Sequence, residues 1–131
     1  MRNKQTTPKQ SQLNEINSIG ENSIKYYRDI LSFIEIEYNK SQEKTVEDFS
    51  TIVTIRLHLA RLYSKLDSKD IKKKVNLLAI SLKCYEETFI SLKTSQFLNS
   101  SATLFEQMKI CEEMIHLLPS KISKVNRGEE I

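Results

Sequence analysis

The feature that most constrains this 131-residue sequence is an unbroken apolar series between Ile71 and Leu92. Its members alternate in spacing between four and three residues: Ile71, Val75, Leu78, Leu82, Tyr85, Phe89 and Leu92. This spacing places every member on one face of an α-helix, whereas a half-buried strand would alternate at every second residue. The series predicts a long amphipathic helix over residues 70–94, with Ser68 or Asp70 as its N-cap.

Two more long helices precede this one. Apolar spacing from Leu13 predicts a first helix up to Tyr38, interrupted at Gly20 so that its main part begins afresh at residue 22 or 23. Thr45 and the acidic residues after it are typical of a helix start, which predicts a second helix over 46–66. Because only a short polar connector separates the second helix from the third, we expect an antiparallel hairpin.

A fourth helix is predicted over residues 101–118 from the same spacing of apolar residues. Pro119 should end this helix, because its ring clashes with the preceding turn and it has no N–H to donate. A short fifth helix would follow it. The side chains expected in the core are Phe49, Val53, Ala60, Tyr63, Leu78, Leu82, Tyr85, Phe89, Leu104, Met108 and Ile115.

The composition supports an all-α fold of antiparallel helix hairpins. The chain has only 2 Gly and 2 Pro, too few for the turns of a β-sandwich or barrel, and its glycines are too far apart for a phosphate-binding loop. Its 39% hydrophobic content suffices for one core. We expect a disordered tail over residues 1–12, a helical domain over 13–127 and a polar end over 128–131.

Three short strings, in this order, resemble the C-terminal region of the kinesin-binding protein family. They are Leu59-Ala60-Arg61-Leu62-Tyr63-Ser64-Lys65, then Asn76-Leu77-Leu78-Ala79 with Ser81, Leu82 and Tyr85, and finally Glu113-Met114 with Leu117-Leu118-Pro119-Ser120-Lys121. The upstream helix with Tyr26-Tyr27 fits the same order, so the resemblance covers roughly residues 22–126.

The resemblance implies the end of a right-handed α-solenoid built from tetratricopeptide-like helix pairs. It also implies a function: binding kinesin motor domains against the concave face and regulating their attachment to microtubules, with a role in axonal microtubule organisation and axon outgrowth. A helix at the end of a solenoid loses a neighbour that would cover it. We therefore expect Phe33, or the pair Tyr26 and Tyr27, to expose apolar surface.

A run of lysines is the candidate partner-binding site. Lys72, Lys73 and Lys74 open the third helix, where cations oppose the helix dipole, and we expect all three to reach solvent beside the 67–70 turn. Lys69 and Lys83 would join them in contacting an acidic partner surface. The alternative is an ordinary solvated face at a helix start.

Arg56 also lies where the apolar stripe of the second helix passes. It either extends to solvent at the edge of the stripe or donates to an acidic group on a neighbouring helix, on a missing part of the protein or on a partner.

The sequence gives little support to an enzyme, and we predict none. His58 has no acidic residue three or four positions away to orient it, and His116 is better explained by a surface pair with Glu112 or Glu113. No zinc-binding motif is present, so no metal or other cofactor is expected. Cys84 and Cys111 fit small core residues, with an exposed thiol as the alternative for Cys84.

Charge and hydropathy bear on partners and location. A net charge of +3, with scattered basic residues, does not favour nucleic acid, and no segment suits a signal peptide or a membrane span. We expect a cytoplasmic, cytoskeleton-associated monomer. The alternatives are a generic helical interaction module or a coiled-coil oligomer with an unrelated partner.

Overall fold

The structure, a computed structural model, describes residues 10–129, with side chains from residue 18 onward. This part of the chain contains four long α-helices, one short 3₁₀ helix and no strand, which confirms the all-α prediction. The elements are α1 (Gln10–Lys40), α2 (Val46–Lys65), α3 (Ile71–Lys93), η1 (Leu98–Ser100) and α4 (Ala102–Asn126).

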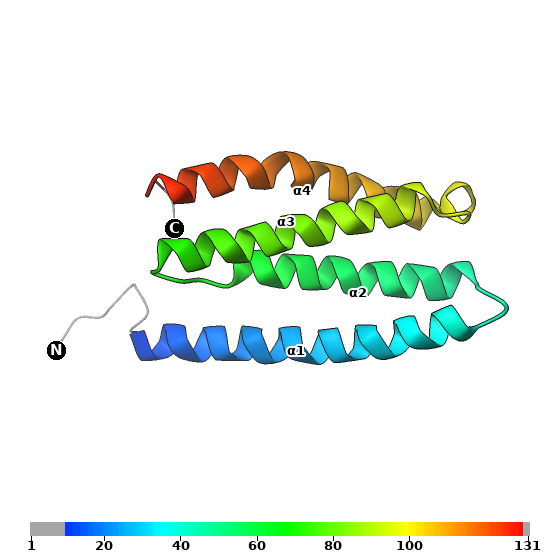
Figure 1. The fold of residues 1–131 in the computed structure, drawn as a ribbon, viewed down its shortest axis with the longest axis horizontal. Helices are drawn as coiled ribbons and strands as arrows, with labels where there is room; N and C mark the ends of the chain where they lie inside the picture. The colour runs from blue at the N-terminus through cyan, green and yellow to red at the C-terminus, as the bar shows by residue number, and fades with distance from the viewer. Residues whose placement is uncertain (1–9, 130–131) are drawn as a thin grey trace.

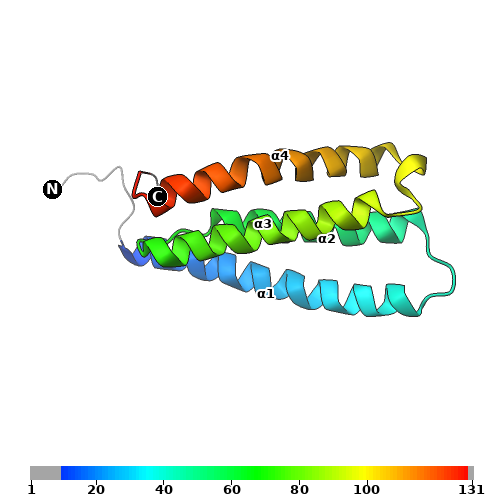
Figure 2. The ribbon, with the colours of Figure 1, turned by 45° about the horizontal axis from the view of Figure 1, so that its top comes forward.

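Successive long helices run in alternating directions, as Figures 1 and 2 show. Helix α1 packs on α2, α2 on α3 and α3 on α4, and α4 also reaches back to touch α2. The fold is therefore a pair of antiparallel helix hairpins, α1–α2 and α3–α4, joined through the contact of α2 with α3.

Side-chain caps fix three helix starts close to where the sequence predicts them. The Thr45 hydroxyl accepts a hydrogen bond from the Asp48 N–H at 3.1 Å and begins α2. The Asp70 carboxylate accepts from the Lys72 N–H at 3.0 Å and begins α3, so Asp70 is the N-cap of that helix. Ser101 begins α4 in the same way. Each cap satisfies a backbone donor that the first turn of a helix leaves unpaired.

The predicted break at Gly20 is wrong, because α1 passes through it without interruption. A Cβ atom at this position would lie 2.7 Å from a methyl carbon of Leu66. Gly20 therefore allows α1 to pack closely against the end of α2. The helix also begins at Gln10, within the segment predicted as a tail; residues 1–9 of that segment lie outside the described residues.

The predicted end of the last helix at residue 118 and the separate fifth helix are also wrong. Helix α4 continues through Pro119 to Asn126 (Figure 1). Pro119 faces solvent, while Leu118 and Val125 on either side of it are buried in the core. Burial of these neighbours holds the helix together. Pro119 has no N–H, so the carbonyl of Ile115, four residues earlier, lacks its helical donor.

The predicted core is confirmed in its centre. Val53, Ala60, Leu78, Tyr85 and Leu104 are buried, together with Leu92, Cys111, Leu118 and Val125. The other predicted members are only partly buried: Phe49, Leu82, Phe89, Met108 and Ile115 pack against this cluster, and Tyr63 packs against a second cluster around Leu59.

Two small residues let α2 and α3 pack closely against each other. Ala60 and Ser81 are fully buried, and the Ser81 hydroxyl donates to the Ala60 carbonyl at 2.6 Å. Ala79 is exposed and takes no part in this contact. Among residues 10–129, none of the helices combines the length and the hydropathy that a membrane-spanning segment requires.

Candidate protein interface

The turn between α2 and α3 presents a cluster of exposed lysines, Lys69, Lys72 and Lys73, called the lysine cluster below. Helix α2 ends at Lys65, and Asp70 caps the start of α3 only a few residues later. The positive end of the α3 dipole disfavours lysines in this turn, and the Asp70 carboxylate offsets that effect. The cluster therefore offers positive charge to solvent at one end of the molecule.

Lys74 does not belong to this exposed cluster, and the prediction that it reaches solvent is wrong. Its side chain is buried, with 4% of the residue exposed. The ammonium group donates to the Leu66 carbonyl at 2.6 Å and the Ser64 carbonyl at 3.2 Å, and it lies 3.8 Å from the Asp67 carboxylate. Lys74 thus binds the last carbonyls of α2, which the helix itself leaves without donors.

The electrostatics of Lys74 reveal a second basic element at the same end. Burial lowers its pKa, Asp67 opposes that shift, and Lys121 of α4 lowers the pKa further. Figure 1 shows that the start of α3 and the end of α4 lie at one end of the fold. Half-buried Lys121 therefore adds positive charge near this turn, and sequence reasoning missed it because it is remote in the chain.

Lys83 is exposed but lies away from the lysine cluster. It is eleven residues beyond Lys72, which corresponds to about 16 Å along the helix, and at 100° per residue the two side chains share nearly the same side of α3. A partner that contacts both lysines must therefore lie along the helix. Whether any of the predicted lysines binds a partner remains a prediction.

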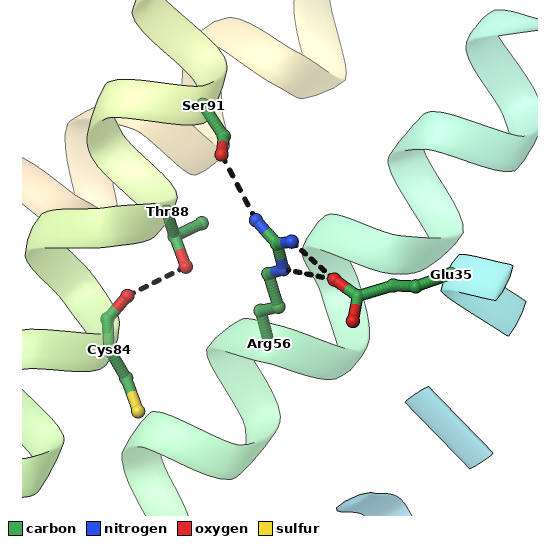
Figure 3. A network of polar contacts seen from close by, with 5 residues as sticks. All are labelled: Glu35, Arg56, Cys84, Thr88 and Ser91. Carbon is green, nitrogen blue, oxygen red and sulfur yellow. Dashed lines mark hydrogen bonds and ion pairs between the residues drawn. The ribbon is translucent and has the colours of Figure 1, made fainter. Parts of the chain in front are cut away.

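Arg56 lies between three helices and is paired, as Figure 3 shows. Its Nε donates to Glu35 Oε2 of α1 at 3.1 Å, Nη2 contacts the same oxygen, and Nη1 donates to the Ser91 hydroxyl of α3 at 3.0 Å. Of the alternatives that the sequence left open, the structure selects the acidic group on a neighbouring helix. About a third of each charged side chain stays exposed, and a role in partner binding remains a prediction.

The outward face of α1 carries an apolar stripe, made of Ile19, Tyr26, Phe33 and Ile36 and called the outer stripe below. Phe33 is 67% exposed and Tyr26 is 61% exposed, which confirms the prediction of uncovered apolar surface on this helix. Tyr27 is half-buried on another side of the helix. Ile19, Tyr26 and Phe33 follow one another at intervals of seven residues, which places them on one face of the helix.

Two open grooves flank α2. The first, of about 430 Å³, lies where α2 meets α4 and α1, and it is lined by Tyr27, His58, Arg61 and Gln107 among others. The second, of about 370 Å³, lies where α2 meets α1 and α3, and it contains the Arg56 network and Cys84. Neither groove was predicted, because the first is formed by residues from all four long helices and the second by residues from three.

His58 and the two cysteines are placed as packing groups, whereas His116 is exposed. The His58 ring lies edge-on to Tyr27, with 4.6 Å between the ring centroids. Burial raises the pKa of the Cys111 thiol to about 11, and burial also raises the pKa of Cys84. Within residues 10–129, no group of three or more His, Cys, Asp or Glu side chains is arranged to hold a metal ion.

These features define an all-helical protein of antiparallel hairpins, with exposed lysines at one end and an exposed apolar stripe on α1. The family described as "KIF-1 binding protein C terminal" matches residues 1–125, nearly the whole chain. The chain belongs to this family.

Several characterised proteins are similar to it. The KIF-binding protein of Gallus gallus is 27% identical over 114 residues, which cover 86% of this chain and 19% of that protein. The KIF-binding protein of Homo sapiens is 27% identical over 111 residues, which cover 84% of this chain and 18% of that protein. The chain thus spans about a fifth of the length of the relatives it matches. No solved structure matches it.

Proposed function

We propose that this chain binds kinesin motor domains as the C-terminal part of a helical scaffold, and that it regulates their activity on microtubules by occlusion and without catalysis. The observation that carries this proposal is the family match over residues 1–125. The similar proteins are named for binding, and the name says that the partner is a KIF protein. We also propose a role in axonal microtubule organisation and axon outgrowth. The same proposal includes a location in the cytoplasm, in association with the cytoskeleton, and a monomeric state.

The mechanism rests on the charge at one end of the fold. The lysine cluster, with Lys121 near the same turn, would attract an acidic surface of the motor. Exposed charges of this kind increase the rate of encounter more than the lifetime of the complex. Since the chain covers about a fifth of its relatives' length, we expect the rest of the interface to come from other helices, and the chain alone to bind weakly.

The proposed test is a charge reversal in the lysine cluster: Lys69→Glu, Lys72→Glu and Lys73→Glu in one protein. The host is a full-length relative in which residues 1–125 of this chain replace the matching segment. A matched control reverses three exposed lysines elsewhere: Lys40→Glu, Lys93→Glu and Lys109→Glu. Both variants change the net charge equally, so a difference between them reflects the position of the charges.

Association with a kinesin motor domain is then measured at two salt concentrations. At low salt the cluster variant should associate roughly tenfold more slowly than the unmodified host, and the control should change much less. The difference should shrink at higher salt, because exposed charges are screened beyond about 8 Å at physiological ionic strength. Equal rates for the cluster variant and the control would remove the lysine cluster from the interface.

A second candidate is self-association through the outer stripe of α1. The spacing of Ile19, Tyr26 and Phe33 by seven residues, with high exposure, favours it. Solution molar mass by light scattering distinguishes the candidates. A concentration-dependent dimer that disappears in a Tyr26→Gln, Phe33→Gln variant would support self-association, and a monomer at all concentrations would exclude it.

A further inference from the structure

The groove between α2, α4 and α1 has features that suit a specific occupant. Its walls come from all four long helices, with Tyr85 contributed by α3, and they are mainly apolar: Tyr27, Ile55, Leu57, Tyr85 and Ile110. Its volume of about 430 Å³ is ample for a large side chain and part of the backbone that carries it. Among the described residues, the lining includes the cation Arg61 and the imidazole of His58, and it holds no carboxylate.

Gln107, on the α4 side of this groove, has an unsatisfied acceptor. The residue is 8% exposed, and its Oε1 has no hydrogen-bond partner among the described residues. A buried acceptor without a donor destabilises the fold relative to a paired one. Such groups are rare in folded proteins, and each requires an explanation.

A chain of hydrogen bonds establishes which atom of the Gln107 amide is the nitrogen and which is the oxygen. Gln107 Nε2 lies 3.0 Å from Thr54 Oγ1, and the Thr54 hydroxyl lies 2.8 Å from the Ser50 carbonyl. A carbonyl can only accept, so Thr54 donates its single hydrogen to Ser50 and must accept from Gln107. The nitrogen of Gln107 therefore faces Thr54, and the unpaired atom is the oxygen.

Arg61 supplies the second recognition element. It is exposed on α2 at the groove, and its guanidinium makes no ion pair or hydrogen bond within residues 10–129. Burial raises the pKa of Tyr85, and the Arg61 charge opposes that rise, so this charge acts on the groove wall. The groove thus combines apolar walls, a spare acceptor and an unpaired cation.

We propose that this groove binds an acidic segment of a partner protein by inserting a tyrosine side chain, whose hydroxyl donates to Gln107 Oε1, while a neighbouring carboxylate pairs with Arg61. The ring of the tyrosine suits the apolar walls, and its hydroxyl provides the missing donor. Oε1 is covered by its neighbours in this structure. Because the terminal torsion of a glutamine is broad, a partial rotation that keeps Nε2 near Thr54 brings Oε1 to the incoming hydroxyl. The proposal does not require the partner to be a kinesin motor.

The test uses short capped peptides and the whole chain. The probe is a hexapeptide with one tyrosine flanked by glutamates. One matched peptide carries phenylalanine in place of tyrosine, and another carries lysines in place of the glutamates. Titrations are followed by ¹H–¹⁵N NMR, which reports the side-chain amide of Gln107 and the backbone around the groove.

The tyrosine peptide should bind roughly five- to tenfold more tightly than the phenylalanine peptide, the effect of one net hydrogen bond. It should shift the Gln107 amide signals, and the lysine peptide should bind more weakly than either. Gln107→Met should abolish the preference for tyrosine. Arg61→Gln should weaken both acidic peptides, whereas the control Arg28→Gln, on an exposed arginine outside the lining, should weaken neither.

Equal affinity of the unmodified chain for the tyrosine and phenylalanine peptides would overturn the proposal, as would shifts located away from the groove. This comparison needs no variant, so it stays decisive even if Gln107→Met fails to fold. The peptide comparison is also independent of the test of motor binding. The peptides can bind a chain that no kinesin motor recognises, and a kinesin motor can bind a chain that does not bind the peptides.

Discussion

The ammonium group of Lys74 donates a 2.6 Å hydrogen bond to the carbonyl oxygen of Leu66, so a lysine from the first turn of α3 closes the end of α2. The same group reaches the Ser64 carbonyl. A lysine in a basic run thus stabilises the hairpin between two helices, while its neighbours Lys72 and Lys73 stay in solvent.

Replacement of Lys74 should therefore reduce stability. Lys74→Met keeps most of the buried stem but leaves the carbonyls of Ser64 and Leu66 without their donor, which should cost about 1–3 kcal/mol in the free energy of unfolding. The matched control Lys72→Met should stay within about 0.5 kcal/mol, because this lysine is exposed. Urea denaturation measures both, and an equal loss for the two variants would contradict the assigned role.

The Arg56 network should couple α1 to α2. Glu35→Gln and Arg56→Met, made singly and together, form a double-mutant cycle. We expect a coupling energy of about 1 kcal/mol, the upper range for partly exposed ion pairs, since two nitrogens of the guanidinium contact one carboxylate oxygen. A coupling energy near zero would show that the contact does not hold in solution.

Core and surface positions on the apolar faces should respond differently to truncation. Leu78→Ala should lose about 2–5 kcal/mol of unfolding free energy, because Leu78 is fully buried. Leu82→Ala should lose less, since this side chain is only partly buried. Phe33→Ser should change stability by about 0.5 kcal/mol or less, as is typical of exposed positions. Comparable losses for Leu78 and Phe33 would contradict the placement of the core.

Thiol chemistry should separate the two cysteines. Cys84 lines an open groove, whereas Cys111 is fully buried, so a thiol reagent should label Cys84 first in the native protein. Burial raises the pKa of both thiols, so labelling of Cys84 should accelerate as the pH rises. Simultaneous labelling of both at neutral pH would contradict this packing.

The raised pKa of Cys111 also predicts a dependence of stability on pH. The folded-state pKa of about 11 exceeds the ordinary value of 9.0, so the unfolded chain releases this proton at lower pH than the folded one. The contribution to stability is complete below pH 9 and declines as the pH rises toward 11. Chemical denaturation at a series of pH values tests this, and Cys111→Val should show a shallower decline.

Much of the fold could be predicted from local sequence. The four-and-three spacing gave α3 and the centre of the core, and the polar residues Thr45 and Asp70 marked two helix starts, because caps act within a few residues. Gly20 and Pro119 misled the prediction because packing overrides local propensity. Gly20 serves a close contact with Leu66, and buried neighbours keep α4 helical at Pro119.

Less of the candidate interface could be predicted from the sequence. Exposed Lys72 and buried Lys74 look alike in a run of lysines, and only the path of the chain at the α2–α3 turn distinguishes them. The partner of Arg56 and the groove at Gln107 depend on contacts between helices that are far apart in the sequence. Such contacts leave no periodic signal, so they required the structure.

Motor binding by a chimera tests the central proposal most directly. In a full-length relative, residues 1–125 of this chain replace the matching C-terminal segment, and affinity for a kinesin motor domain is measured beside the relative itself and a deletion of the segment. The account predicts that the chimera binds within about tenfold of the relative, a difference of about 1.4 kcal/mol, and that the deletion binds far more weakly. A folded chimera that binds no better than the deletion would contradict it.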